Sequence, residues 1–177
     1  FMTSHPRDAS TKLFDTMAKY DKIAKQLHLP FQSGSSRVLK AMNRHYDRET
    51  YLEKVMYAKS VMPDLVLTSD VIVGFPGETE EEAMDTVSLV EEVGFDALFT
   101  FIYSPRGGTP AAAMEDPTPK ADKNRRFDRL VQLQNKISGY LAELETIEAE
   151  YAAIRATDYD RIPGGSGGGQ AGFGAPQ

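Results

Sequence analysis

The sequence predicts an α/β fold: a partial (β/α) barrel of parallel strands, followed by a long helix and a disordered tail. Strand-like segments alternate with helical segments over residues 8–103, a rhythm typical of parallel β/α units. The run Val71-Ile72-Val73 is β-branched, which favours a strand covered on both faces. A glycine turn and a helix start follow this run directly. They predict a ligand site at the carboxyl ends of the strands.

The individual elements are predicted from the spacing of apolar residues. The predicted strands are residues 25–31, 65–73 and 97–103, and the predicted helices before residue 119 are residues 8–20, 35–42, 48–61 and 79–93. We expect the helices to cover one face of the sheet. The opposite, concave face is expected to carry Gln32, Asp70 and Tyr103, since polar residues stand at or near the strand ends.

Capping residues support these helix boundaries. Either Ser10 or Asp8 can cap the first helix. Thr79 followed by Glu82 predicts a capping box for the helix over 79–93, and Gly94 predicts its end. Four carboxylates around this helix start are interpreted as a solvated first turn that complements the helix dipole, namely Glu78, Glu80, Glu81 and Glu82.

From Pro119 onward the pattern predicts one long amphipathic helix. Its apolar stripe consists of Leu130, Leu133, Ile137, Leu141, Leu144, Ile147, Tyr151 and Ile154. At about 1.5 Å per residue such a helix spans on the order of 50 Å. Gly139 interrupts it, so the helix either continues past this residue or folds back there. The glycine-rich tail over 164–177 is expected to be disordered.

The composition excludes several classes of function. The chain contains no cysteine, which excludes disulfides, thiolate catalysis and cysteine-ligated metal in this chain. Its three histidines lack the spacing of metal ligands, so no metal site is expected. A formal net charge of −6 argues against strong nucleic-acid binding. No apolar run reaches the roughly 18 residues of a membrane span, so none is predicted.

Four segments, taken in order, resemble the radical S-adenosylmethionine (SAM) methylthiotransferases that modify isopentenyl-adenosine in tRNA. The segments begin with Thr3-Ser4-His5-Pro6, continue through residues 28–48 and 68–79, and end with residues 99–111. The resemblance covers roughly residues 1–137. Residues 138–177 do not match this family and weakly resemble the start of small phage proteins, which a fusion near residue 138 would explain.

The resemblance divides the chain into three parts. Residues 1–137 correspond to the C-terminal half of a radical SAM partial barrel. Residues 138–160 form a helical extension, and residues 161–177 form a disordered glycine-rich tail.

The resemblance also implies a SAM site across the carboxyl ends of the strands. The residues that it assigns to this site are Gln32, Ser33, Arg44, Arg48, Asp70, Gly74, Phe75, Tyr103 and Ser104. No catalytic residue is assigned. For several of these residues a structural role stays open: a turn hydrogen bond for Gln32, a solvated cation at a helix end for Arg44 or Arg48, and a core position for Phe75.

Asp70 is the most informative of these residues, because a carboxylate within an apolar strand is costly unless it is paired. It is expected to bond SAM, Arg44 or a neighbouring loop. Gly74 and Phe75 are expected to touch adenine, since glycine permits a close approach of the backbone.

The family holds its iron–sulfur cluster with cysteines that this chain lacks. The resemblance therefore predicts a cytoplasmic fragment of a tRNA methylthiotransferase that retains weak SAM binding and is inactive alone, with tRNA as the partner of the parent enzyme. Members of this family usually end in a small RNA-binding β-barrel, and this module is expected to be missing here, because no run of short alternating strands follows residue 120. The alternative hypothesis is a non-enzymatic, phage- or element-borne helical interaction protein fused to an inert α/β segment.

Overall fold

The computed structural model describes residues 5–159, with side chains described up to residue 155. The chain divides into two units, Phe1–Tyr140 and Leu141–Gln177, which are described separately below. The predicted disordered tail, residues 161–177, lies outside the described residues.

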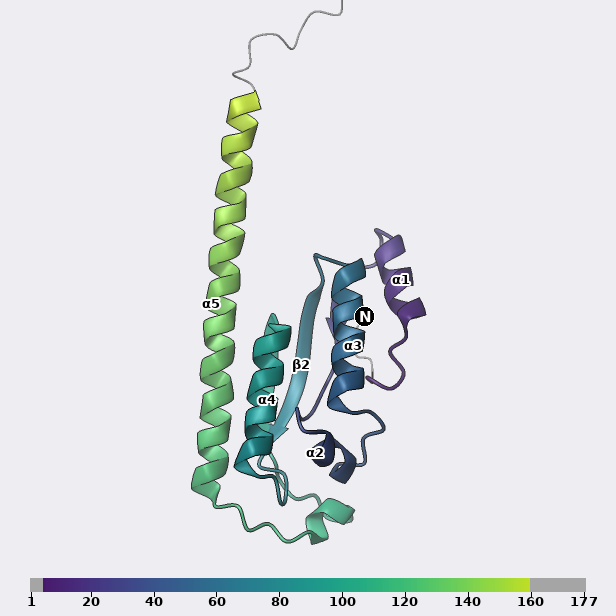
Figure 1. The fold of residues 1–177 in the computed structure, drawn as a ribbon, viewed down its shortest axis with the longest axis vertical. Coiled ribbons are helices and arrows are strands. Elements are labelled where there is room, and N and C mark those ends of the chain that lie inside the picture. The colour runs from purple at the N-terminus through teal and green to yellow at the C-terminus, as the bar shows by residue number, and fades with distance from the viewer. Residues whose placement is uncertain (1–4, 160–177) are drawn as a thin grey trace, which may run out of the picture. The chain divides into compact units, whose positions relative to one another are not determined.

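The first unit contains a parallel sheet of three strands, as predicted (Figure 1). The strands are β1 (Gln26–His28), β2 (Val66–Val73) and β3 (Ala97–Ile102), in the order β1-β2-β3. Strand β1 is shorter than the predicted 25–31. Proline at position 30 has no N–H for the ladder. The carbonyl of Leu29 is instead bonded by the hydroxyls of Ser69 and Tyr51, each at 2.8 Å.

The helices lie close to their predicted positions. In chain order they are α1 (Thr11–Lys19), α2 (Ser36–Ala41), α3 (Arg48–Val61), α4 (Glu80–Val93), the short 3₁₀ helix η1 (Pro110–Ala113) and α5 (Lys120–Tyr159). Of the two candidate caps for α1, the structure selects Ser10, whose hydroxyl accepts the Leu13 N–H at 3.3 Å. Gly94 ends α4 in the left-handed conformation, as predicted.

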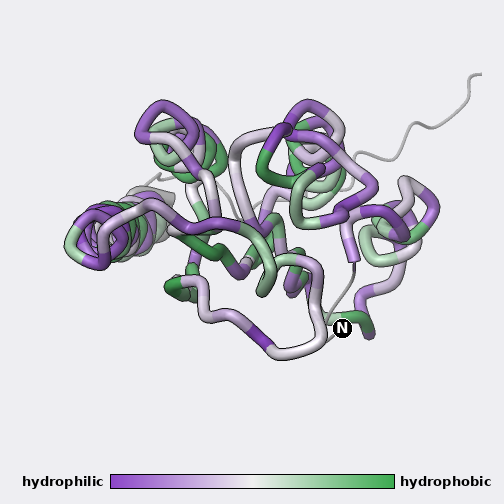
Figure 2. The backbone as a smooth tube through the Cα atoms, turned by 90° about the horizontal axis from the view of Figure 1, so that it is seen from below, coloured by the Kyte–Doolittle hydropathy of each residue, from purple (hydrophilic) through white to green (hydrophobic). Residues whose placement is uncertain are grey.

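Helices α3 and α4 cover one face of the sheet, and apolar backbone positions gather between these helices and the strands (Figure 2). Strand β2 alternates between buried residues, such as Val71, and half-buried residues, such as Asp70 and Ile72. The expectation that both faces of this strand are covered is therefore wrong for the described chain. On the same open face, Phe99 and Phe101 of β3 are 53% and 52% exposed.

The capping box of α4 is present and makes a testable contribution to stability. Thr79 Oγ1 accepts the Glu82 N–H at 3.2 Å, and Glu82 returns the bond to the Thr79 N–H at 2.9 Å. Thr79→Ala is expected to lower the free energy of unfolding by about 1 kcal/mol, measured by urea denaturation. Ser88→Ala, an exposed change in the middle of the same helix, serves as the control and is expected to cost nothing.

Helix α5 runs without a break through Gly139, so the alternative in which it folds back at this residue is wrong. Within the first unit, Leu130 is buried, and Leu133 and Ile137 pack against the core. The Gln134 side chain donates to the carbonyl of Phe95 at 2.7 Å. Among the described residues, no helix combines the length and the apolar character that crossing a membrane requires.

Candidate functional site

A cavity of about 1000 Å³ lies at the carboxyl ends of the strands in the first unit. It is lined by six of the nine residues that were assigned to the SAM site, namely Gln32, Arg44, Asp70, Phe75, Tyr103 and Ser104. Lys40, Asn43, Arg106 and Thr109 also line it. The cavity therefore brings together residues of β2 and β3 and residues from the segments that follow all three strands.

Gln32, in the wall of the cavity, has a strained backbone conformation. Its φ is +68°, a conformation that non-glycine residues rarely adopt. Two hydrogen bonds to β2 hold it there: the Gln32 N–H donates to the Asp70 carbonyl at 3.0 Å, and the Gln32 carbonyl accepts the Ile72 N–H at 2.9 Å. Strain maintained at the rim of a cavity is typical of ligand sites. Asn43, which sequence reasoning missed, has φ +59° on the same cavity.

Asp70 faces the open side of the sheet, where its partner is His28 on the neighbouring strand β1. Its Oδ2 lies 3.4 Å from His28 Nε2, and His28 Nδ1 lies 2.8 Å from Thr68 Oγ1. The pairing with Arg44 that was expected from the sequence is not found in the described chain. Sequence reasoning missed His28. The signal was its register position, because His28 pairs with Thr68, two residues before Asp70.

The Arg44 side chain is held by His5, which lies in the segment before α1. Its Nη1 lies 3.3 Å from His5 Nε2. Burial, aided by the charge of Arg44, lowers the pKa of His5, which favours the neutral ring as hydrogen-bond acceptor. The Arg44 Nε is buried and has no partner among the described residues. A buried donor without a partner is costly, so a ligand that accepts from it is favoured.

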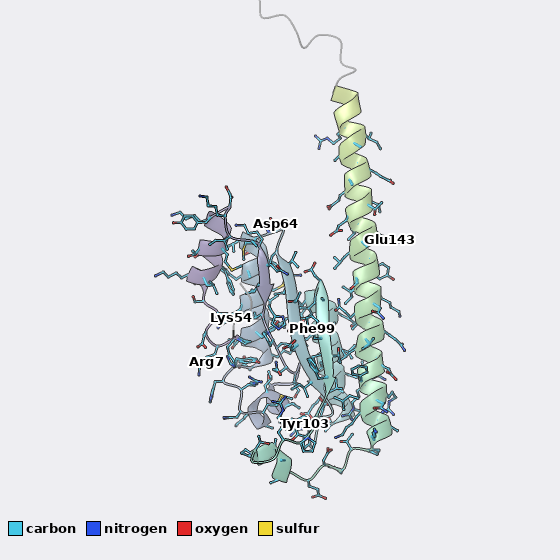
Figure 3. All side chains as sticks on the ribbon, turned by 180° about the vertical axis from the view of Figure 1, so that it is seen from behind. Arg7, Lys54, Asp64, Phe99, Tyr103 and Glu143 are labelled. Carbon is cyan, nitrogen blue, oxygen red and sulfur yellow. The ribbon has the colours of Figure 1, made fainter. Side chains whose placement is uncertain are left out.

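Phe75 and Tyr103 form the aromatic end of the cavity. Their rings meet edge to face with centroids 5.2 Å apart. The Tyr103 hydroxyl is buried and has no hydrogen-bond partner among the described residues. Tyr103 lies at the carboxyl end of β3, beyond Phe99 on the same strand (Figure 3). An aromatic wall with an unpaired hydroxyl beside it suits a heteroaromatic ring with polar substituents.

The loop that carries Phe75 is held from behind by α5. The Glu78 carboxylate accepts the Gly74 N–H at 2.7 Å and Arg126 Nη1 at 2.9 Å. Glu78 is 4% exposed, so its interpretation as part of a solvated first turn is wrong. Burial raises the pKa of Glu78, opposed by the Gly74 N–H and by Arg126.

The other carboxylates at this helix start lie nearer the surface. Glu82 pairs with Arg37, and this hydrogen bonding lowers the pKa of Glu82 to about 2. The Glu80 carboxylate forms ion pairs with three arginines, Arg125, Arg126 and Arg129.

Three residues that were assigned to the site do not line the cavity. Ser33 is fully buried, and its hydroxyl accepts the Ser35 N–H at 3.2 Å. Arg48 instead joins α3 to α4, bonding the Asp85 carbonyl at 2.5 Å and Glu92 at 3.1 Å. Gly74 has φ +69°, and an added Cβ would lie 2.6 Å from Lys123 Cγ. Its missing side chain therefore makes room for α5.

Residues 1–90 match the family model described as the radical SAM superfamily. The chain belongs to the radical SAM superfamily. This assignment confirms the partial (β/α) barrel that the resemblance implied. The likeness extends to the solved structure of coproporphyrinogen III oxidase (HemN) from Escherichia coli, a radical SAM enzyme. The two share the fold with a TM-score of 0.63 at 19% identity, over 76% of this chain and 31% of that one.

Curated relatives of this radical SAM chain are much closer in sequence. The chain is 55% identical over 138 residues to the tRNA-2-methylthio-N(6)-dimethylallyladenosine synthase of Clostridium botulinum (strain Hall). It is 58% identical over 136 residues to the synthase of the same name from Clostridium perfringens (strain SM101). These matches cover 78% and 77% of this chain. The chain spans only 31% and 30% of the length of these two relatives.

Proposed function

We propose that the first unit is a SAM-binding part of a radical SAM methylthiotransferase acting on a modified adenosine in tRNA. The observation that carries the proposal is the cavity at the strand ends, which gathers six of the residues that the family resemblance assigns to SAM. Similarity to curated tRNA methylthiotransferases supports the reaction and tRNA as the partner of the complete enzyme. A cytoplasmic location belongs to the same proposal.

The chain's own residues suit the parts of SAM in the following way. Phe75 and Tyr103 provide an aromatic wall for adenine, and the unpaired Tyr103 hydroxyl is a hydrogen-bonding group for its edge. Asp70 and Gln32 carry acceptors for the ribose hydroxyls. The unpaired Nε of Arg44 is a donor for the carboxylate of the methionine end.

The residues present do not fit an iron–sulfur cluster, since its thiolate ligands are missing. In radical SAM enzymes that cluster supplies the electron that cleaves bound SAM. We therefore infer that this chain by itself binds SAM without cleaving it. Its cavity positions the adenosyl group, and the chemistry requires a cysteine-bearing part supplied by other sequence.

The first test concerns the cluster. After anaerobic reconstitution with iron and sulfide, the chain is expected to show no stoichiometric cluster absorption, and with dithionite and SAM it is expected to form no 5′-deoxyadenosine. The Clostridium botulinum synthase, reconstituted in parallel, is the positive control. Stoichiometric absorption together with product from this chain would contradict the inference of inactivity.

The second test concerns SAM binding, followed by calorimetry or ligand-observed NMR. We expect a Kd of roughly 1 mM, equivalent to about 4 kcal/mol, since the iron that chelates the methionine end is missing. Asp70→Asn is expected to weaken binding about 3- to 10-fold, because the amide loses one acceptor. Glu81→Gln, which likewise converts a carboxylate into an amide but at an exposed position, is the control. Equal affinities for the two variants would show that SAM binds elsewhere.

A further inference from the structure

Three apolar residues of α5 in the second unit form an exposed stripe along the helix. Leu144, Ile147 and Tyr151 of α5 are 54%, 59% and 62% exposed. Their spacing of three and then four residues places them at positions a, d and a of a coiled-coil heptad, and Ile154 continues the spacing. The stripe is therefore arranged like the core seam of a coiled coil.

The stripe is narrow, which limits what fits against it. The positions between its members carry alanine, threonine and glutamate, as in Ala149 and Thr146. Apolar residues restricted to positions a and d are typical of a seam that packs against a single helix. A broad apolar face suited to a sheet or a bundle would need further apolar positions.

Of the four e and g positions that flank the stripe between residues 143 and 155, three are acidic and one is basic. Glu143, labelled in Figure 3, and Glu150 occupy g positions. Glu148 occupies the e position between them. Arg155 occupies the next e position and lies over the Tyr151 ring, 6.0 Å from its centroid. Charges at e and g determine which helix pairs with a coiled-coil seam.

A second copy of this chain complements the seam less well than a basic helix does. In a parallel pair, Glu143 of one copy faces Glu148 of the other, whereas Glu150 faces Arg155 favourably, so the charges do not favour pairing overall; the two Tyr151 rings also share one layer. In an antiparallel pair the g positions face each other, which opposes Glu143 and Glu150 of one copy to the same residues of the other. Like charges at these positions disfavour pairing.

We propose that residues 143–155 of α5 dock one basic helix of another protein. The complementary helix carries an apolar heptad stripe, a small residue opposite Tyr151, and lysine or arginine at the flanking positions. Acidic flanks also disfavour nucleic acid and anionic lipid as occupants. This surface lies outside the SAM site, so it does not depend on the function proposed above.

The test uses the full chain and two labelled synthetic helices of about three heptads. Both have leucine or isoleucine at a and d, with alanine opposite Tyr151; one has lysine at e and g, and the other has glutamate. In fluorescence anisotropy the lysine peptide is expected to bind at least about tenfold tighter than the glutamate peptide. Ile147→Asp is expected to weaken this binding at least about tenfold, with circular dichroism confirming that the variant keeps its helix.

A matched pair of charge reversals separates docking from general attraction. Glu148→Lys, beside the seam, is expected to weaken binding of the lysine peptide several-fold more than Glu145→Lys on an outward b position. Equal losses for the two variants, no binding of the lysine peptide at about 1 mM, or unchanged binding by Ile147→Asp would overturn the proposal. So would sedimentation data showing self-association of the chain that Ile147→Asp abolishes, since that outcome assigns the seam to a second copy.

Discussion

Replacing Arg126 with methionine is expected to lower the free energy of unfolding by about 3–5 kcal/mol at pH 7.5. The Arg126 and Glu78 side chains are 7% and 1% exposed, so the substitution leaves a carboxylate buried without its cation. Urea denaturation followed by circular dichroism measures the loss. Arg125→Met is the matched control. Its guanidinium is 54% exposed, and its pairs with Glu80 and Asp122 are expected to contribute less than about 1 kcal/mol.

The same variant is expected to show a specific dependence on pH. Burial raises the pKa of Glu78 above its ordinary value, so the folded chain binds this proton more tightly than the unfolded chain. The resulting stability is complete below the unfolded pKa and is lost as pH rises through the folded pKa. Removing Arg126 raises the folded pKa further. The loss caused by Arg126→Met should therefore be smaller at pH 5 than at pH 7.5, and equal losses at the two values would contradict the assignment to Glu78.

Gly34→Ala is expected to lower the free energy of unfolding by about 3 kcal/mol. An added Cβ would lie 2.5 Å from both the Asp85 carbonyl oxygen and the Thr86 Cα, and neither backbone atom can move without shifting α4. The Gly34 N–H also donates to Thr86 Oγ1 at 2.9 Å, so the two segments are already in close contact.

Gly107→Ala provides the control for the glycine substitution. An added Cβ at Gly107 meets no atom within 4 Å, and its φ lies outside the left-handed region. This variant is expected to stay within about 0.5 kcal/mol of the original chain in the same denaturation experiment. A loss for Gly34→Ala no greater than that for Gly107→Ala would show that α4 accommodates the methyl group.

Most of the fold was predictable because its signals are local. Helix α3 matches the predicted residues 48–61, and α4 begins at the predicted capping box and ends before Gly94. The parallel pairing of β2 with β3 follows from the helix between them. The end of β1 was less predictable, because the hydroxyls of Ser69 and Tyr51 bond the Leu29 carbonyl, and backbone pairing with β2 resumes only at Gln32.

The candidate site was predictable in position and only partly in composition. Strand ends and a glycine turn indicate where a ligand binds in an α/β fold. They do not indicate where each polar side chain points. Arg44 and Arg48 look alike in the sequence, yet Arg44 lines the cavity and Arg48 bonds α4. The difference arises because Arg48 begins α3 at a point where its side chain reaches both Asp85 and Glu92 of α4.

The sequence by itself determined the order of strands and helices, the end of the sheet at which the cavity lies and the lack of thiolates for a cluster, since each depends on residue type and local spacing. The tertiary structure decided which polar groups are buried and which partners they meet. Glu78 and Glu81 are neighbours at one helix start, but Glu78 is buried because Arg126, 48 residues later, lies against it. Burial and pairing depend on contacts between distant segments, which local spacing does not contain.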